Sequence, residues 1–159
     1  MFTYHEASHA VMAHLQHGRI KPIAVGKSGG KSKRLTAHPQ GEWSKPSDRR
    51  SQIEREILIL FAGQLAQNLF TGRHSGRGAD YPQAKTLAAH VAPEEKERKA
   101  YLDWLWLRAQ NLLNDSSTRA AVQTLAEALR SEPEVRGVRT IGVRQAKTII
   151  KGVLSDGHT

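Results

Sequence analysis

Two histidines stand four residues apart near the start of the sequence, at His5 and His9, and Glu6 directly follows the first. Residues four apart share one face of an α-helix, so a helix over this stretch brings both imidazoles to one side with the Glu6 carboxylate beside them. Apolar residues between positions 7 and 15 fit a buried helix, and Gly18 can end it. The spacing therefore predicts a buried helix that presents two imidazoles and a carboxylate together.

These residue types suit a zinc ion that activates water. Catalytic zinc takes three protein ligands and keeps a fourth position for water, whose pKa falls to about 7. A carboxylate beside that water can take its proton and pass it to a leaving amine. We therefore predict His5 and His9 as metal ligands and Glu6 as the catalytic base of a zinc peptidase. In a different interpretation, Thr3 and Glu6 form a capping box, with Glu6 turned back to the Thr3 amide.

The residue types and their spacing do not identify the third metal ligand. Cysteine is absent, so the ligand must be a histidine, an aspartate or a glutamate. A glutamate from a following helix, as in thermolysin-like sites, makes Glu54 and Glu56 candidates. Asp80 is another candidate, although aspartate also favours the N-cap of a helix. Four further histidines turn away from the His5/His9 face or lack supporting context: His14, His17, His74 and His90.

The composition fits a soluble globular chain. The chain has 159 residues, so residues 1–159 have the size of a single domain. Its hydrophobic content of 38% is typical of a globular protein. No apolar run approaches the roughly 18 residues of a membrane span, and no signal peptide precedes the histidine motif. The lack of cysteine excludes a disulfide framework. We therefore expect a cytoplasmic protein without an integral membrane segment.

The net charge of +9 is a second functional clue. Basic residues gather between positions 27 and 34, at Arg49 and Arg50, and between positions 136 and 151. A basic surface attracts nucleic acid, anionic membranes and acidic polypeptides. No nucleic-acid module with interleaved aromatic residues accompanies these clusters. We therefore interpret them as solvated surface charge and do not expect a nucleic-acid partner, and strongly salt-dependent binding to DNA or RNA would indicate the opposite.

Helical periodicity predicts a mainly α fold. Helices are expected over residues 47–70, 80–91, 94–114, 117–130 and 143–154. Strands over 20–25 and 34–38, joined through Gly29 and Gly30, predict a small β-hairpin after the first helix, whose edge could pair with an extended peptide. The glycines of the loop over 72–79 suit a close approach to a metal or substrate. Residues 131–142 are interpreted as a linker, and Trp104 and Trp106 as core or interface aromatics.

Several separated segments resemble the protease domain of the FtsH family of zinc metalloproteases, ATP-dependent membrane proteases that include paraplegin. The stretch 4–10 (YHEASHA) is similar to the family's YHEAGHA helix, 61–66 (FAGQLA) to its AGRxAEE-like helix, and 76–88 to its GASNDIQQATNLA segment. Residues 108–113 and 125–129 are in step with its two late helices. The resemblance covers nearly the whole chain. It implies an FtsH-like helical zincin fold, with Asp80 as the third zinc ligand.

Departures from the family pattern concern the substrate cleft more than the metal. Ser8 replaces a glycine, Gly78 and Ala79 replace Ser-Asn, and Gln67 stands where an acidic residue is usual. The family's ATPase module and membrane segments have no counterpart in this sequence. We therefore expect a stand-alone metalloendopeptidase that uses Zn2+ to cleave flexible or unfolded polypeptides without an ATPase of its own.

The expected partners are a polypeptide substrate, a separate ATPase or adaptor, and a second copy of the chain in a homo-oligomer. The alternative function is a non-proteolytic metal-binding interaction protein on the same fold, with a protein or nucleic-acid partner. Intact His5, Glu6 and His9 favour the enzyme, because a scaffold needs no catalytic base.

Overall fold

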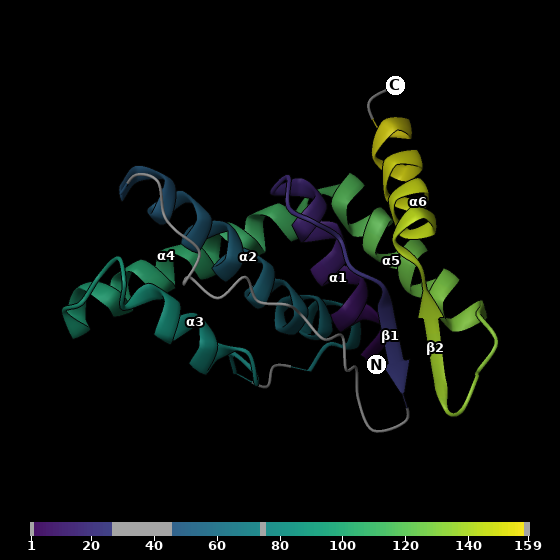
Figure 1. Ribbon diagram of the computed structural model, residues 1–159, viewed down its shortest axis with the longest axis horizontal. Coiled ribbons are helices and arrows are strands. Elements are labelled where there is room, and N and C mark those ends of the chain that lie inside the picture. The colour runs from purple at the N-terminus through teal and green to yellow at the C-terminus, as the bar shows by residue number, and fades with distance from the viewer. Residues whose placement is uncertain (1, 27–45, 74–75, 158–159) are drawn as a thin grey trace.

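The described structure is mostly helical, and the predicted mainly α class is confirmed. The computed structural model describes residues 2–26, 46–73 and 76–157, with the backbone alone at 46–48. Its helices are α1 (Phe2–Leu15), α2 (Pro46–Thr71), α3 (Tyr81–Ala88), α4 (Glu95–Asn114), α5 (Ser116–Ser131) and α6 (Val143–Asp156). Two short strands, β1 (Ile23–Gly26) and β2 (Val138–Ile141), form a small sheet (Figure 1).

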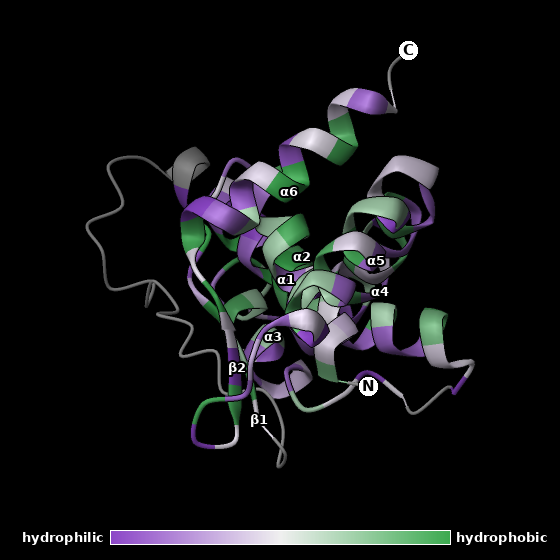
Figure 2. Cartoon of the chain, turned by 90° about the vertical axis from the view of Figure 1, so that its right-hand side faces the viewer, coloured by the Kyte–Doolittle hydropathy of each residue, from purple (hydrophilic) through white to green (hydrophobic). Residues whose placement is uncertain are grey.

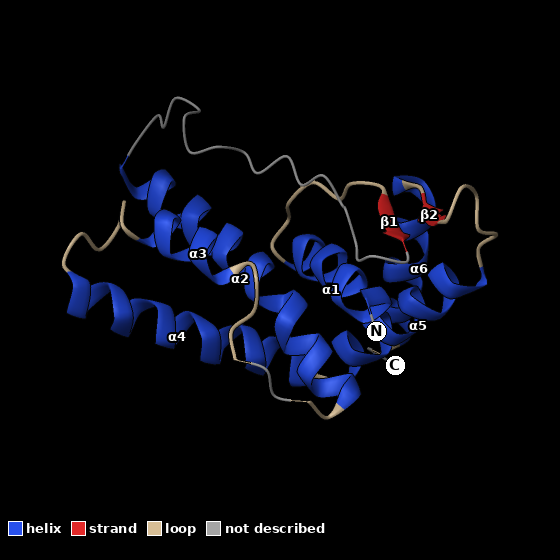
Figure 3. Ribbon diagram, turned by 90° about the horizontal axis from the view of Figure 1, so that it is seen from below, coloured by secondary structure: helices blue, strands red, loops and turns tan. Residues whose placement is uncertain are grey.

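Helix α1 lies between two groups of elements. On one side it packs against α2, which in turn carries α3 and α4, and on the other side it packs against α5, α6 and the sheet (Figures 1 and 3). The helix is buried along most of its length, as the exposed fractions of Ala7, Val11 and Met12 at 0% illustrate. Burial on more than one side of a helix is typical of a central position in a fold. The predicted metal motif therefore lies on the central helix.

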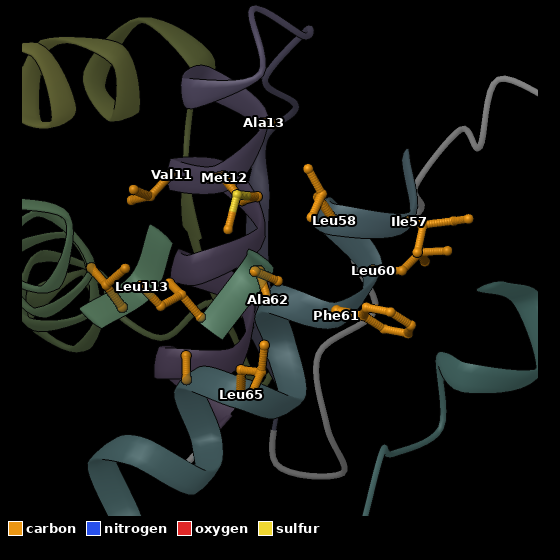
Figure 4. Packing of buried hydrophobic residues seen from close by; sticks show 14 of the residues in the cluster. Val11, Met12, Ala13, Ile57, Leu58, Leu60, Phe61, Ala62, Leu65 and Leu113 are labelled. Atoms are coloured by element: carbon orange, nitrogen blue, oxygen red, sulfur yellow. The ribbon is translucent and has the colours of Figure 1, made fainter. Parts of the chain in front are cut away.

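The α1 and α2 helices share the main part of the core. Met12 of α1 points toward Leu58 of α2, whereas Val11 points to the opposite side of α1 (Figure 4). Phe61 and Ala62, one turn further along α2, are fully buried. The burial of these side chains stabilises the packing of α2 against α1 by removing apolar surface from water. This packing sets the position of α2 relative to the imidazoles on α1.

Helices α5 and α6 are amphipathic and cover the other side of the core. Ala146 and Ile150 of α6 are buried, and apolar and polar residues alternate along this helix (Figure 2). The start of α5 is fixed by Asp115, whose carboxylate accepts a hydrogen bond of 3.1 Å from the Thr118 amide. This is the usual N-cap arrangement, in which a side-chain oxygen satisfies an amide that has no partner within the helix.

The sheet differs from the predicted hairpin. Strand β1 overlaps the predicted strand over 20–25, but it pairs antiparallel with β2, so that Ile23 lies opposite Ile141 and Gly26 opposite Val138. The predicted second strand over 34–38 lies outside the described residues. The linker interpretation of 131–142 is wrong for Val138–Ile141, which follows a tight turn where Arg136 and Gly137 both have positive φ. The two paired strands are far apart in the sequence, so no local hairpin pattern could predict this pairing.

The helix predictions agree closely with the structure. The observed bounds of α2, α4, α5 and α6 lie within a few residues of those expected, and α3 ends at Ala88, slightly before the predicted end. These are long segments with a strong apolar period, for which sequence patterns are most informative. In the part of the chain that the structure describes, every helix is too short or too polar to cross a bilayer.

Candidate metal centre

Helix α1 brings the three motif residues together as its geometry requires. The rings of His5 and His9 lie one turn apart, with centroids separated by 4.6 Å and planes at 86°. One ligand atom from each of His5, Glu6 and His9 falls within 4.8 Å of the others. Glu6 and His9 are buried, so the group lies inside the protein surface and not on its outer face. This combination of donors can hold a divalent metal ion.

The Asp80 carboxylate meets both imidazoles. Its Oδ2 atom lies 3.4 Å from His5 Nε2 and 3.4 Å from His9 Nε2. Asp80 directly precedes α3, and its side chain makes no capping hydrogen bond to that helix. The side chain is therefore directed to the histidines and does not act as a side-chain N-cap.

The spacing of these atoms fits a tetrahedral zinc site. Zinc binds histidine nitrogen and carboxylate oxygen at about 2.0–2.2 Å, so two ligand atoms at tetrahedral corners lie about 3.3–3.6 Å apart. The separations of 3.4 Å from Asp80 Oδ2 to each Nε2 fall in this interval. The three residues can thus serve as one ligand set without a large rearrangement of the backbone.

A hydrogen bond across the helix contact fixes the orientation of His9. Its Nδ1 atom lies 2.7 Å from the carbonyl oxygen of Ile59 on α2. A carbonyl oxygen only accepts, so Nδ1 carries a proton, and in the neutral imidazole the lone pair is then on Nε2, which faces Asp80. A histidine that ligates a metal usually has such a partner on its other nitrogen. His5 differs, because its Nδ1 atom is buried and finds no hydrogen-bond partner among the described residues.

Gly63 on α2 keeps space open between the two imidazoles. A Cβ atom added at this position would lie 2.6 Å from the Nε2 atoms of both His5 and His9, and 2.5 Å from His9 Cε1. Such distances are far below van der Waals contact, so any larger residue would push the rings apart or fill the place between them. Gly63 is not among the site residues predicted from the sequence. An isolated glycine within an otherwise apolar helical pattern was the available signal.

A second glycine lets the loop that carries Asp80 lie directly on α2. Gly78 has φ of +80°, and a Cβ added there would lie 2.4 Å from Gln64 Oε1. Gln64 is buried, and its amide nitrogen donates a hydrogen bond of 2.8 Å to Asn68 Oδ1. The positive φ and the close contact both favour glycine. The structure thus shows a close approach of this loop to α2 at Gly78, whereas its approach to a metal or substrate stays a prediction.

A cavity opens beside the group of Glu6 and His9. Its volume is about 80 Å³, and it lies between α1, the segment before β1, and α2. Its lining consists of Glu6, His9, Ala10, Ala13, Arg19, Ile20, Lys21, Pro22, Ile23, Glu56 and Ile59. A space of this size holds a few water molecules or one aliphatic side chain and is smaller than the 150 Å³ cavity that accepts benzene.

The other carboxylate candidates have different surroundings. Glu54 Oε1 accepts hydrogen bonds from Arg50 Nε at 3.2 Å and from the Tyr101 hydroxyl at 3.1 Å, so it joins α2 to α4. Burial, followed by the charge of Glu54, raises the pKa of Tyr101. Glu56 lines the cavity beside Glu6. Among these candidates, Asp80 is the one whose carboxylate the structure brings to both Nε2 atoms.

Of the remaining histidines that the structure describes, none belongs to this group, and Thr3 and Glu6 do not form the predicted capping box. His90 Nδ1 lies 2.5 Å from Arg49 Nη2, and His74 lies outside the described residues. His14 and His17 stand at the far end of α1 and the turn after it. Thr3 is inside α1 and accepts a hydrogen bond from Arg130 Nε at 3.1 Å, so it is not the N-cap that a capping box requires.

No protein-family model matches this chain, and no curated protein matches it either. The resemblance to FtsH protease domains therefore stays a prediction. A function can be proposed from the geometry and chemistry of the candidate metal centre.

Proposed function

We propose that this chain is a zinc-dependent metalloendopeptidase in which His5, His9 and Asp80 bind the metal and Glu6 is the catalytic base. The observation that carries the proposal is the Asp80 Oδ2 atom at 3.4 Å from the Nε2 atoms of both histidines. Two imidazoles and one carboxylate form a donor set that zinc enzymes use, and they leave a coordination position for water. The FtsH-like assignment is supported by the sequence resemblance alone.

Glu6 is suited to move a proton at this site. It follows His5 on the same helix, its side chain is buried, and one of its oxygens belongs to the compact group with both imidazoles. Bound zinc would lower the pKa of water and polarise the substrate carbonyl. Glu6 takes a proton from the water molecule while the water oxygen attacks the carbonyl carbon of the substrate. Glu6 then gives this proton to the amine nitrogen as the peptide C–N bond breaks.

The position of the centre favours flexible polypeptide as the substrate. The side chain of His9 is only 8% exposed and that of Asp80 is 30% exposed, so the ligand atoms lie below the surface. A peptide bond in a folded domain could not reach them without unfolding locally, whereas an extended segment could. The cavity beside Glu6 and His9 offers room for one side chain of such a segment.

Cleavage of unfolded casein in the presence of zinc tests this function. The wild-type chain is compared with Glu6→Gln, which retains every proposed metal ligand and loses the base. We expect equal zinc content in both proteins and a rate that falls about 100-fold to 10,000-fold in the variant, which is the usual contribution of general acid and base catalysis. Equal cleavage by both proteins would contradict the assignment of Glu6.

Metal analysis of the same samples separates the enzyme from the alternative function. Zinc binding without cleavage by either protein would favour a non-proteolytic metal-binding interaction protein. Failure of the wild type to bind zinc at neutral pH would reject both functions. Asp80→Ala serves as the ligand variant in this series, and we expect it to bind zinc much more weakly and to lose cleavage.

A further inference from the structure

The side chain of Arg77, three residues before Asp80, is held from several directions. Its Nη2 atom donates a hydrogen bond of 2.5 Å to Asp103 Oδ1 on α4, and Nη1 donates to the Tyr81 hydroxyl at 3.3 Å. The guanidinium carbon lies 5.3 Å from the ring centroid of Tyr81 and 5.3 Å from that of Trp106. One cation thus joins the Asp80 loop to the first residue of α3 and to two residues of α4.

These contacts use properties that are specific to arginine. A planar guanidinium can donate hydrogen bonds in its plane while its faces lie against aromatic rings. Burial opposes the charge of Arg77, but the hydrogen bonds to Asp103 and Tyr81 outweigh burial and raise its pKa. The side chains of Arg77 and Asp103 are 31% and 44% exposed, so solvent screens this ion pair in part. The ring contacts and the hydrogen bond to Tyr81 therefore add to the ion pair in holding the guanidinium.

The same cluster reaches the helix that carries Gly63. Phe61 of α2 is fully buried and packs edge-on against Trp106, with centroids 5.0 Å apart and planes at 70°. It also stacks on Tyr81 at 6.0 Å and 23°. Phe61 is two residues before Gly63, and Tyr81 follows Asp80 directly. The cluster thus ties the segment that carries Asp80 to the segment of α2 that lies against the imidazoles.

We infer that Arg77 is a positioning residue, which holds the Asp80 carboxylate at ligand distance from His5 and His9 through its contacts with Asp103, Tyr81 and Trp106. Arg77 and Tyr81 are on the two sides of Asp80 in the sequence, and both are anchored in the same cluster. The Asp80 backbone is therefore fixed from both directions before any metal binds. This inference rests on the proposed function, because it assumes that Asp80 is a zinc ligand.

Zinc dissociation constants, measured by competition with a chromophoric chelator, test the role of Arg77. We expect Arg77→Gln to weaken zinc binding about 10-fold to 100-fold, as is usual when a group that orients a metal ligand is removed. Arg77→Lys keeps the charge but loses the planar contacts, so its affinity should fall between those of wild type and Arg77→Gln. Arg108→Gln removes an exposed arginine from the same helix as Trp106 and should bind zinc as the wild type does.

A double-mutant comparison with Asp80 distinguishes positioning from a general loss of structure. If Arg77 acts through Asp80, Arg77→Gln has no further effect on zinc affinity in an Asp80→Ala background, where only the histidines remain to bind. An equal loss of affinity in both backgrounds would overturn the inference, because it would indicate a role in the fold as a whole. Thermal unfolding of each protein with chelator present verifies that the variants are folded.

The outcomes also separate this inference from the proposed function. A wild-type protein that binds no zinc would overturn both. A wild type that binds zinc and loses affinity on Asp80→Ala, but not on Arg77→Gln, would overturn the role of Arg77 alone and leave the metal centre in place.

Discussion

His9 is linked to Ile59 by a hydrogen bond of 2.7 Å that crosses the contact between α1 and α2. The acceptor is a backbone carbonyl, so it does not depend on the side chain at position 59. It does depend on how closely α2 approaches α1. Any change that moves these helices apart should therefore disturb the orientation of the His9 ring and with it the candidate metal centre.

Gly63→Ala should disrupt the site more than its size suggests. The new methyl group would lie 2.5–2.6 Å from atoms of His5 and His9, so the two helices must separate or the rings must rotate. We expect a loss of stability of about 1–3 kcal/mol, as for other overpacked positions, and a loss of zinc binding. Thermal unfolding and zinc titration measure the two effects.

Gly152→Ala provides the matched control for that substitution. Gly152 lies in α6, and a Cβ added there meets nothing within 4 Å. This variant should bind zinc normally and gain about 0.5–1 kcal/mol from helix propensity. Normal zinc binding by Gly63→Ala would show that the space between the imidazoles is not needed.

Asp80→Ala should lower zinc affinity and leave stability unchanged, whereas Glu54→Ala should lower stability and leave zinc affinity unchanged. Removal of Asp80 takes away a proposed ligand, so zinc affinity falls while the core packing is unchanged. Removal of Glu54 instead breaks the hydrogen bonds from Arg50 and Tyr101 and lowers stability by about 1–3 kcal/mol, because the hydroxyl group of the buried Tyr101 loses its acceptor. Zinc titration with chemical denaturation of each variant checks both. Loss of zinc from Glu54→Ala, with full retention in Asp80→Ala, would contradict the ligand assignment.

Ala13→Leu tests whether the cavity receives a substrate side chain. Ala13 is buried in the cavity wall, and a larger residue would fill part of its volume of about 80 Å³. We expect zinc binding to remain and cleavage of peptides with a large aliphatic side chain to slow by about 10-fold, which corresponds to the loss of one or two buried methylene groups. Ala120→Leu, on the exposed face of α5, is the control. Equal slowing of small and large substrates would argue against a side-chain site.

Stability should depend on pH through His14. Burial, followed by the positive charge of Lys151, lowers the pKa of His14 below its ordinary value of 6.5. The unfolded chain therefore takes up a proton at a higher pH than the folded chain does, and stability falls as the pH drops below 6.5. His14→Gln should flatten this part of the profile. Urea unfolding between pH 5 and 7.5, with chelator to exclude metal effects, measures it, and an unchanged slope would contradict this role.

The sequence was informative where structure depends on local spacing. The helix periods and the His5, Glu6 and His9 spacing could be interpreted without knowledge of distant contacts, since each depends on residues within a few turns. The strand β2 could not, because only Ile141 of its four residues is buried and the segment becomes a strand only by pairing with β1.

Local sequence patterns also could not predict where the Asp80 carboxylate lies. An aspartate before a helix normally indicates an N-cap, so residues alone left Asp80 equal to other carboxylates and the family resemblance was needed to prefer it. Its direction depends on tertiary contacts: Gly78 lies against Gln64, and Arg77 is held by Asp103. Gly63 was missed for the same reason, since its neighbours come from a different helix.

The most direct test of the metal centre is a crystal structure of the zinc-loaded wild type, with anomalous diffraction data collected on both sides of the zinc absorption edge. We predict one strong anomalous peak bonded to Nε2 of His5, Nε2 of His9 and an oxygen of Asp80, at about 2.0–2.2 Å from each. A peak coordinated by other residues, or no peak beside the two imidazoles, would contradict it.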